Sequence, residues 1–274
     1  MKLAHKAPSV SYPSNGFSDF SDGVTSYAKA FSLIFRLRLW SYLVIPGLLS
    51  LALGSSIAYG VYTSSGVFSG ILSSIYPQNW FGAGLFVKIS GVASWLILGV
   101  GGLFSYRVLL MAIVAPFMSP LAARVQADIL GIEVYDPPFF SFTNVRLILR
   151  GAVLSFRNMM KEMWFTFWLL LLSLIPPFGL FIPFILFAIQ AFYSGFGNMD
   201  YSLEKYYGIA DSKKFSQKHR WLAVGNGTVF LSLLAVPVLG LFFAPALSTV
   251  AATLESIKRI DGRLKNVKEL EQFI

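Results

Sequence analysis

The 274-residue chain is 55% hydrophobic and only 13% charged, whereas a soluble domain typically carries about 25% charged residues. It has no cysteine and two histidines, His5 and His219, which excludes disulfide frameworks and thiolate chemistry and leaves almost no material for a metal site, a cofactor site or a hydrolytic triad. The formal net charge is +9, but the basic residues alternate with Asp and Glu in short segments, so we expect anionic lipid head groups rather than nucleic acid as partners.

The N-terminal region divides into a polar tail over 1–22, without the apolar core of a cleavable signal peptide, and an amphipathic interfacial helix over 23–39. Apolar residues recur on one face of that helix: Val24, Tyr27, Phe31 and Ile34. The helix delivers Arg36 and Arg38 to the start of the first long apolar segment. There they either raise the local concentration of anions or serve as ordinary interfacial anchors.

Two long apolar segments, 40–62 and 87–115, are long enough to cross a bilayer core of about 30 Å. Between them, 63–84 is rich in Ser and Gly and uncharged, so we expect an outside loop. Arg107 lies within the second segment. An arginine in a span is a functional candidate, although Arg107 is also placed where it could snorkel to the far interface.

Two further apolar blocks, 164–197 and 222–254, share one plan: an apolar half, a proline with a glycine, and a second apolar half. We expect sharp bends at Pro176, Pro177 and Pro237, because proline removes a helical donor and clashes with the preceding turn. Half-segments of about 12 to 15 residues suit helices that enter the bilayer only partly. The last segment, 255–274, has the pattern of an amphipathic helix.

Charge sorting sets the topology. The basic residues cluster before the first long segment, after the second, between the two interrupted blocks and in the tail. The positive-inside rule places all four clusters, and both termini, in the cytoplasm. Each interrupted block then begins and ends on the same side. Two long transmembrane helices with two partly penetrating hairpins satisfy this, as do six full crossings; the short halves and the proline hinges favour the hairpins.

The sequence therefore predicts one all-α integral membrane domain over 1–274. Broken helices inside the bilayer would present helix N-termini that can hold an anion. Small polar groups could add donors or simply bond to their own helix backbone: Ser173, Asn226, Thr228, Ser232, Ser248 and Thr249.

Several motifs appear in a fixed order: AFSLIFRLRLWSYLVIPGLL from residue 30, Ala-Pro-Phe at 115–117, Met-Asp-Tyr at 199–201 and Val-Pro-Val-Leu-Gly at 236–240. In order and spacing they resemble the CysZ-type sulfate permease family, which includes members of the eukaryotic endoplasmic reticulum. The resemblance implies two long transmembrane helices with two partly penetrating hairpins, homo-oligomers, and uptake of sulfate for cysteine synthesis across a bacterial inner membrane.

The resemblance also implies site residues. The family's sulfate-binding Gly-Leu-Arg turn falls near Arg38, Leu39 and Trp40, where the glycine is absent and the arginine displaced, although Arg36 and Arg38 could substitute. The remaining pore or structural candidates are Arg107, Pro116, Phe117, Pro176, Pro177, Asp200, Asn226 and Pro237.

Alternatives to a permease remain open at this point. The chain has no P-loop motif, so transport would be channel-like or gradient-coupled. The altered Gly-Leu-Arg turn and the amphipathic terminal helices would also suit a non-transporting scaffold or assembly factor. An enzyme is not expected, because the acidic candidates Asp200 and Glu204 follow the end of a hairpin, where capping is the ordinary role.

Overall fold

The computed structural model describes residues 15–75, 81–132, 142–173, 175, 178–236 and 239–260, and every regular element in those ranges is helical. The α-helices are α1 (Gly16–Arg36), α2 (Ser41–Ser74), α3 (Ala83–Leu130), α4 (Phe142–Ser173), α5 (Ile182–Leu203), α6 (Ile209–Lys218), α7 (Arg220–Leu234) and α8 (Leu239–Ile260), and a 3-10 turn, η1, covers Phe178–Leu180. The predicted all-α class is confirmed for this part of the chain.

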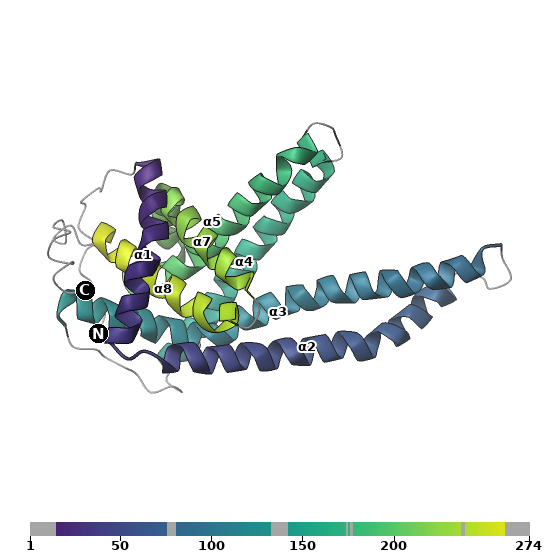
Figure 1. The fold of residues 1–274 in the computed structure, drawn as a ribbon, viewed down its shortest axis with the longest axis horizontal. Coiled ribbons are helices and arrows are strands. Elements are labelled where there is room, and N and C mark those ends of the chain that lie inside the picture. Colours follow the sequence, from purple (N-terminus) through teal and green to yellow (C-terminus); the bar gives the residue numbers. More distant parts are fainter. Residues whose placement is uncertain are drawn as a thin grey trace.

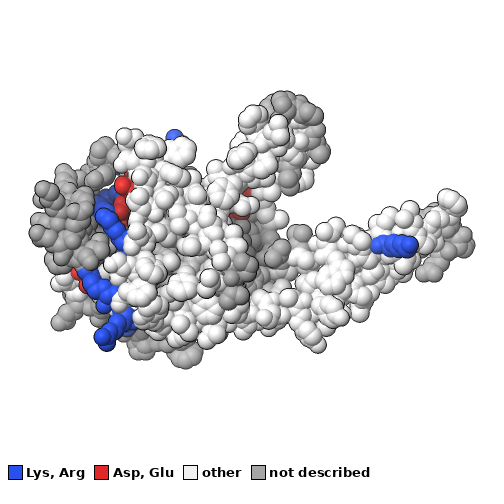
Figure 2. Space-filling view, in the orientation of Figure 1, with Lys and Arg blue, Asp and Glu red and all other residues white. Residues whose placement is uncertain are grey.

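The helices form a body from which two helix pairs project (Figure 1). We call residues 51–74 of α2 with 83–106 of α3 the long prong, and residues 163–173 of α4 with 182–190 of α5 the short prong. The body contains α1, α7, α8 and the remaining parts of α3 and α5. On the face shown in Figure 2, charged side chains gather at the end of the body away from the prongs, and the prongs are nearly free of charge apart from a basic spot near the tip of the long one.

Three of the described helices are long and apolar enough to cross a membrane: α2, α5 and α8. The most apolar window of α2 is only 17% buried within the protein, whereas that of α8 is 83% buried. A helix that is apolar all round and exposed belongs in lipid. The chain is therefore an integral membrane protein, in which α2 presents its surface to lipid and α8 forms the centre of the body.

The uncharged segment 63–84, expected as an outside loop, is mostly helical, because α2 continues to Ser74 and α3 begins at Ala83. That expectation was wrong. The hydroxyl groups in the segment donate to carbonyls of their own helix, as Thr63 Oγ1 does to Tyr59 O at 3.0 Å. Pairing of α2 with α3 along the prong also supports the helix, for example where Tyr62 meets Trp95 with ring centroids 6.2 Å apart. Ser and Thr are compatible with a membrane helix when their hydroxyl groups bond to the backbone of that helix.

Other boundaries also differ from the sequence-based ones. α1 covers Gly16–Arg36 rather than 23–39, and its Tyr27 and Ile34 are buried in the core instead of facing lipid, while Phe31 remains exposed. α4 begins at Phe142, well before the expected hairpin at 164, and α8 continues to Ile260 past the expected break at 255. The segments 1–14 and 261–274, and the three hinge residues Pro176, Pro177 and Pro237, lie outside the described residues.

Glycines bring the backbones of α1, α5 and α7 into direct contact. A Cβ atom on Gly195 of α5 would lie 1.8 Å from the carbonyl oxygen of Ala223, and one on Gly227 of α7 would lie equally close to the backbone of α5. On the α1 side, a Cβ on Gly225 would lie 2.4 Å from the carbonyl oxygen of Phe20. Small residues permit such close crossings in membrane helices. α7 is thus held between two helices and positions Asn226 in the centre of the body.

Candidate functional site

The turn between α1 and α2 carries four of the predicted site residues. Arg38 has a φ of +53°, a left-handed conformation that glycine adopts at least cost. The N–H of Leu37 donates to Leu33 O at 2.9 Å and that of Leu39 to Ile34 O at 3.0 Å, which ends α1 and redirects the chain into α2. Leu39 is buried, and Trp40 meets the ring of Phe35 edge-on, with centroids 4.4 Å apart.

The two arginines of this turn differ in their surroundings. Arg36 forms an ion pair with Asp128, near the end of α3, and both side chains are partly exposed. Arg38 is exposed, and no ion pair joins it to another residue in the described ranges. The turn therefore offers one guanidinium whose charge a carboxylate balances and one that is available to an anion from solution.

Asp200, a second predicted candidate, is held by Arg150 of α4. Arg150 donates through Nη2 to Asp200 Oδ1 at 2.8 Å and through Nε to Oδ2 at 3.1 Å, and through Nη1 to the carbonyl of Tyr207 at 3.0 Å. Asp200 occupies the guanidinium of Arg150, and neighbouring Glu204 lies farther from it, with its carboxylate 4.0 Å from Arg150 Nε. Burial raises the pKa of Glu204 to about 8. The arrangement is a bidentate ion pair that ties α4 to α5, which makes the role of Asp200 structural rather than catalytic.

Asn226 of α7 connects its helix to three others through its side-chain amide and its backbone carbonyl. Its Nδ2 donates to Ser248 O on α8 at 3.1 Å, and its Oδ1 accepts from Asn198 Nδ2 on α5 at 3.0 Å. The backbone carbonyl of Asn226 accepts from Tyr27 on α1 at 2.7 Å. Both ends of the Asn226 side-chain amide are therefore engaged in contacts between helices.

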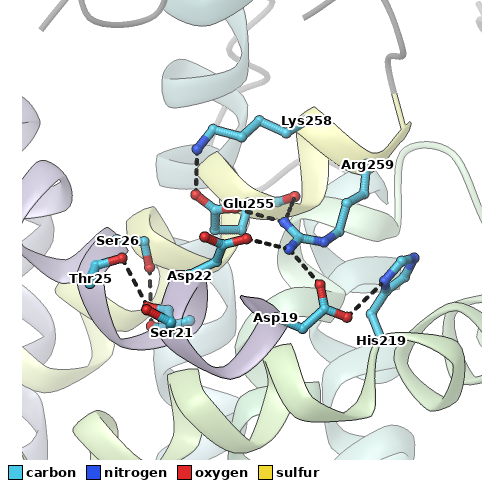
Figure 3. Close-up of polar contacts among 10 residues, drawn as sticks. Asp19, Ser21, Asp22, Thr25, Ser26, His219, Glu255, Lys258 and Arg259 are labelled. Carbon is cyan, nitrogen blue, oxygen red and sulfur yellow. Dashed lines mark hydrogen bonds and ion pairs between the residues drawn. The ribbon is translucent and has the colours of Figure 1, made fainter. Parts of the chain in front are cut away.

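A buried charge cluster that the sequence did not reveal joins α1 to α8 (Figure 3). Arg259 is 2% exposed and donates through Nη2 to Asp19 at 2.7 Å and to Asp22 at 2.9 Å, and through Nη1 to Glu255 at 2.7 Å. His219 Nδ1 lies 3.5 Å from the other oxygen of Asp19. Burial lowers the pKa of His219, and the positive charge of Arg259 adds to the effect.

The other candidates are spread through the fold. Pro116 is buried and Phe117 packs against the core where α3 enters the body. Arg107 belongs to α3, but its side chain lies outside the described part of the structure, as do the three hinge prolines. Of the small polar groups, Thr228, Ser232 and Ser248 bond to carbonyls of their own helices, as the simpler interpretation expected.

Among the predicted residues that it describes, the structure does not bring all into one site. Arg36, Arg38, Leu39 and Trp40 share a turn, whereas Asp200 and Asn226 belong to separate networks inside the body. The partners that sequence reasoning missed are charged residues at helix ends, whose pairing spans as many as 240 positions of sequence. The one indication of such pairing in the sequence was Asp200, the single charged residue of α5.

Comparison with known families decides the assignment. The family model described as "Sulfate transporter CysZ/Etoposide-induced protein 2.4", EI24, matches residues 26–245. The chain belongs to the EI24 family. The suspected resemblance is thereby confirmed, while no curated protein matches the chain significantly.

The EI24 match has a defined extent in the structure. It begins in α1 and ends in α8, so it includes the α1–α2 turn, both prongs, the network of Asp200, and Asn226 with all its partners except Ser248. Asp19 and Asp22 precede it, and Glu255 and Arg259 follow it. The buried charge cluster thus lies largely outside the part of the chain that the EI24 model matches.

Proposed function

We propose that this EI24-family protein is a permease for sulfate or a related oxyanion. It would act as a channel or couple transport to a gradient, supplying sulfur assimilation from the inner membrane of a bacterium. The observation that carries the proposal is the α1–α2 turn, where the backbone is left-handed at Arg38 in the place of the family's Gly-Leu-Arg turn.

A left-handed residue other than glycine costs about 1 to 2 kcal/mol. Strained backbone conformations of this kind are concentrated at functional sites, where the surrounding structure holds them in place. Here it sets an exposed guanidinium beside the first turn of α2, two residues from Arg36. We infer that Arg38 supplies the positive charge for an anion at the entrance, in place of the displaced family arginine.

The lengths of the prongs support the proposed membrane topology. In the long prong, α2 continues from its contact with α8 at Gly47, where a Cβ atom would lie 2.4 Å from the ring of Phe242, to Ser74. That stretch is about 40 Å long at 1.5 Å per residue, enough for a bilayer core of about 30 Å. In the short prong, α5 runs from Ile182 to its close contact with α7 at Ala191, about 14 Å. A helix pair of that reach suits partial penetration, and the charge at the far end of the body suits cytoplasmic termini.

Flux of radiolabelled sulfate into proteoliposomes tests the proposal. We expect uptake well above that of empty vesicles, and we expect Arg38→Gln to lower it several-fold at low sulfate concentration with less effect at saturation. Lys214→Gln is the matched control, because it removes one exposed positive charge far from the turn in sequence, on α6. If uptake by the wild-type protein equals that of empty vesicles, the protein is not a sulfate permease.

A second candidate function, a non-transporting scaffold or assembly factor, is favoured by the pairing of Arg36 with Asp128, which neutralises half of the positive charge of the turn. Asp128→Asn distinguishes the two functions. If Arg36 serves anion entry, releasing it from Asp128 should increase sulfate uptake. A scaffold would show no flux in either form and would copurify with a partner whose loss has the same phenotype.

We also propose that the protein works as a homo-oligomer. Large aromatic side chains are exposed on both prongs, among them Trp95, Trp164 and Trp168. Such rings pack well at helix interfaces as well as against lipid. Mass measurement of the protein in lipid nanodiscs would give the number of subunits, and a monomer would contradict this part of the proposal.

A further inference from the structure

A groove of about 590 Å³ lies between the short prong and the start of α7. Its wall is apolar along the prong, where α4 contributes Phe165 and α5 contributes Ile185, Ile189 and Phe192. The residues of α5 that line it run from 185 to 193, about 12 Å along the helix axis. This wall is long enough for part of an alkyl chain to lie along it.

One end of the groove is polar. Arg220 and Gln217 line it where the short prong meets the body, beside the indole of Trp221. Arg220 is exposed, and no described residue forms an ion pair with it. Trp221 is 47% exposed and its ring lies against Gly16, where a Cβ atom would be 2.8 Å from the indole. A cation and a fixed tryptophan at the end of an apolar groove match the level of lipid head groups.

We propose that this groove binds one anionic phospholipid, with an acyl chain along the short prong and the head-group phosphate on Arg220. The charge of Arg220 complements a phosphate, and a guanidinium binds phosphate through paired N–H donors. Arg220 begins α7 and closely follows the basic helix α6, a segment that the proposed topology places at the cytoplasmic leaflet, where anionic lipids attract basic residues. The inference rests on that orientation and not on transport.

Native mass spectrometry of the whole protein, delipidated in detergent and titrated with phosphatidylglycerol or phosphatidylcholine, tests the proposal. We expect one tightly bound phosphatidylglycerol per chain. Arg220→Gln should weaken its binding about tenfold, the effect of losing a charge-assisted hydrogen bond, and should weaken phosphatidylcholine binding less, because the choline cation already offsets the charge of that phosphate. Lys214→Gln, the matched control, should alter neither. Arg220 is exposed, so the variant should fold.

A second variant tests the apolar wall. Ala188→Phe places a ring in the groove and should weaken the binding of both lipids. An unchanged unfolding temperature would show that the fold of the variant is intact. Equal loss of phosphatidylglycerol binding in Arg220→Gln and Lys214→Gln would overturn the proposal. Displacement of the lipid by millimolar inorganic phosphate would also overturn it, because the groove would then be a site for free anions. A third contrary result would be a dimer that Ala188→Phe dissociates without changing lipid binding, because a second copy of the chain would then occupy the groove. None of these readouts depends on sulfate flux.

Discussion

Arg38 stands where glycine would be less strained, and this makes its substitution informative. We expect Arg38→Gly to raise the free energy of unfolding by about 1 kcal/mol, because it removes the cost of the left-handed backbone. The same change should lower sulfate uptake, because the charge is lost. Thermal unfolding in detergent measures the first effect and proteoliposome flux the second.

Arg36→Gly is the natural comparison, since it changes the same residue type two positions earlier. It places glycine in the last turn of α1 and removes the ion pair with Asp128, so it should destabilise the protein. If both glycine variants were destabilised alike, the strain assigned to Arg38 would be wrong.

His219 should make stability depend on pH. Its folded-state pKa is lowered by burial, with the charges of Arg259 and Lys218 also opposing protonation and that of Asp19 favouring it. Below the ordinary value of about 6.5 the unfolded chain binds a proton that the folded chain refuses, so stability falls as pH falls, by at most about 1.4 kcal/mol per pH unit.

The variant His219→Gln should lose this part of the dependence. Lowering the pH from 7.5 to 5.5 should therefore reduce the unfolding temperature of the wild-type protein more than that of His219→Gln. The two values converge if the variant is the less stable at pH 7.5 and move apart if it is the more stable. The raised pKa of Glu204 contributes the opposite trend, with stability falling as pH rises toward 8, but it is present in both proteins and cancels in their difference. A difference that stays constant with pH would contradict the prediction.

At the scale of elements, α5 provides a matched pair of glycines. Gly195→Ala would place a Cβ 1.8 Å from the carbonyl oxygen of Ala223, so the two helices must separate, which should cost about 3 kcal/mol or more. Gly197, two residues along the same helix, has nothing within 4 Å. Gly197→Ala should therefore be neutral or stabilising by up to about 1 kcal/mol.

Unfolding in increasing concentrations of SDS, or on heating, would measure the stability of both alanine variants. Equal stability of the two would mean that α5 and α7 do not approach as closely as the structure has them.

The helices themselves were largely predictable, and their ends were not. The apolar runs at 40–62 and 87–115 overlap α2 and α3, because hydropathy reports what a span needs. The same measure could not extend α2 across Ser and Gly to Ser74, because hydropathy does not show that the hydroxyl groups there bond to carbonyls of their own helix. The pairing of α2 with α3, as at Tyr62 and Trp95, is a contact between distant segments that a single sequence does not contain.

The candidate site shows the same division. Arg38 was found because it precedes a span, whereas the burial of Tyr27 and the pairing of Arg150 with Asp200 depend on α1 and α4 reaching the body from other parts of the chain. Asn226 was singled out as a polar group in an apolar block, but its amide joins helices rather than binding a ligand. Polar residues inside apolar segments thus marked important positions without revealing their roles.

At the scale of the whole molecule, the two prongs should differ in accessibility. The chain has no cysteine, so introduced cysteines can be read singly. Ser74→Cys at the tip of the long prong should react with an impermeant thiol reagent applied from outside, and Leu180→Cys near the tip of the short prong should not, because lipid surrounds it. Labelling of both positions at similar rates would support six full crossings.

The glycine contacts of α7 also restrict how the protein can move. Where carbonyl oxygens of one helix touch the backbone of the next, there is no side chain to repack, so α1, α5 and α7 cannot slide past one another and must turn as a single block. Gly60, Gly66 and Gly70 of the long prong have open space around them. Any gating motion should therefore be a bending of the long prong relative to the block formed by α1, α5 and α7. Measuring the distance between the tips of the two prongs would detect it.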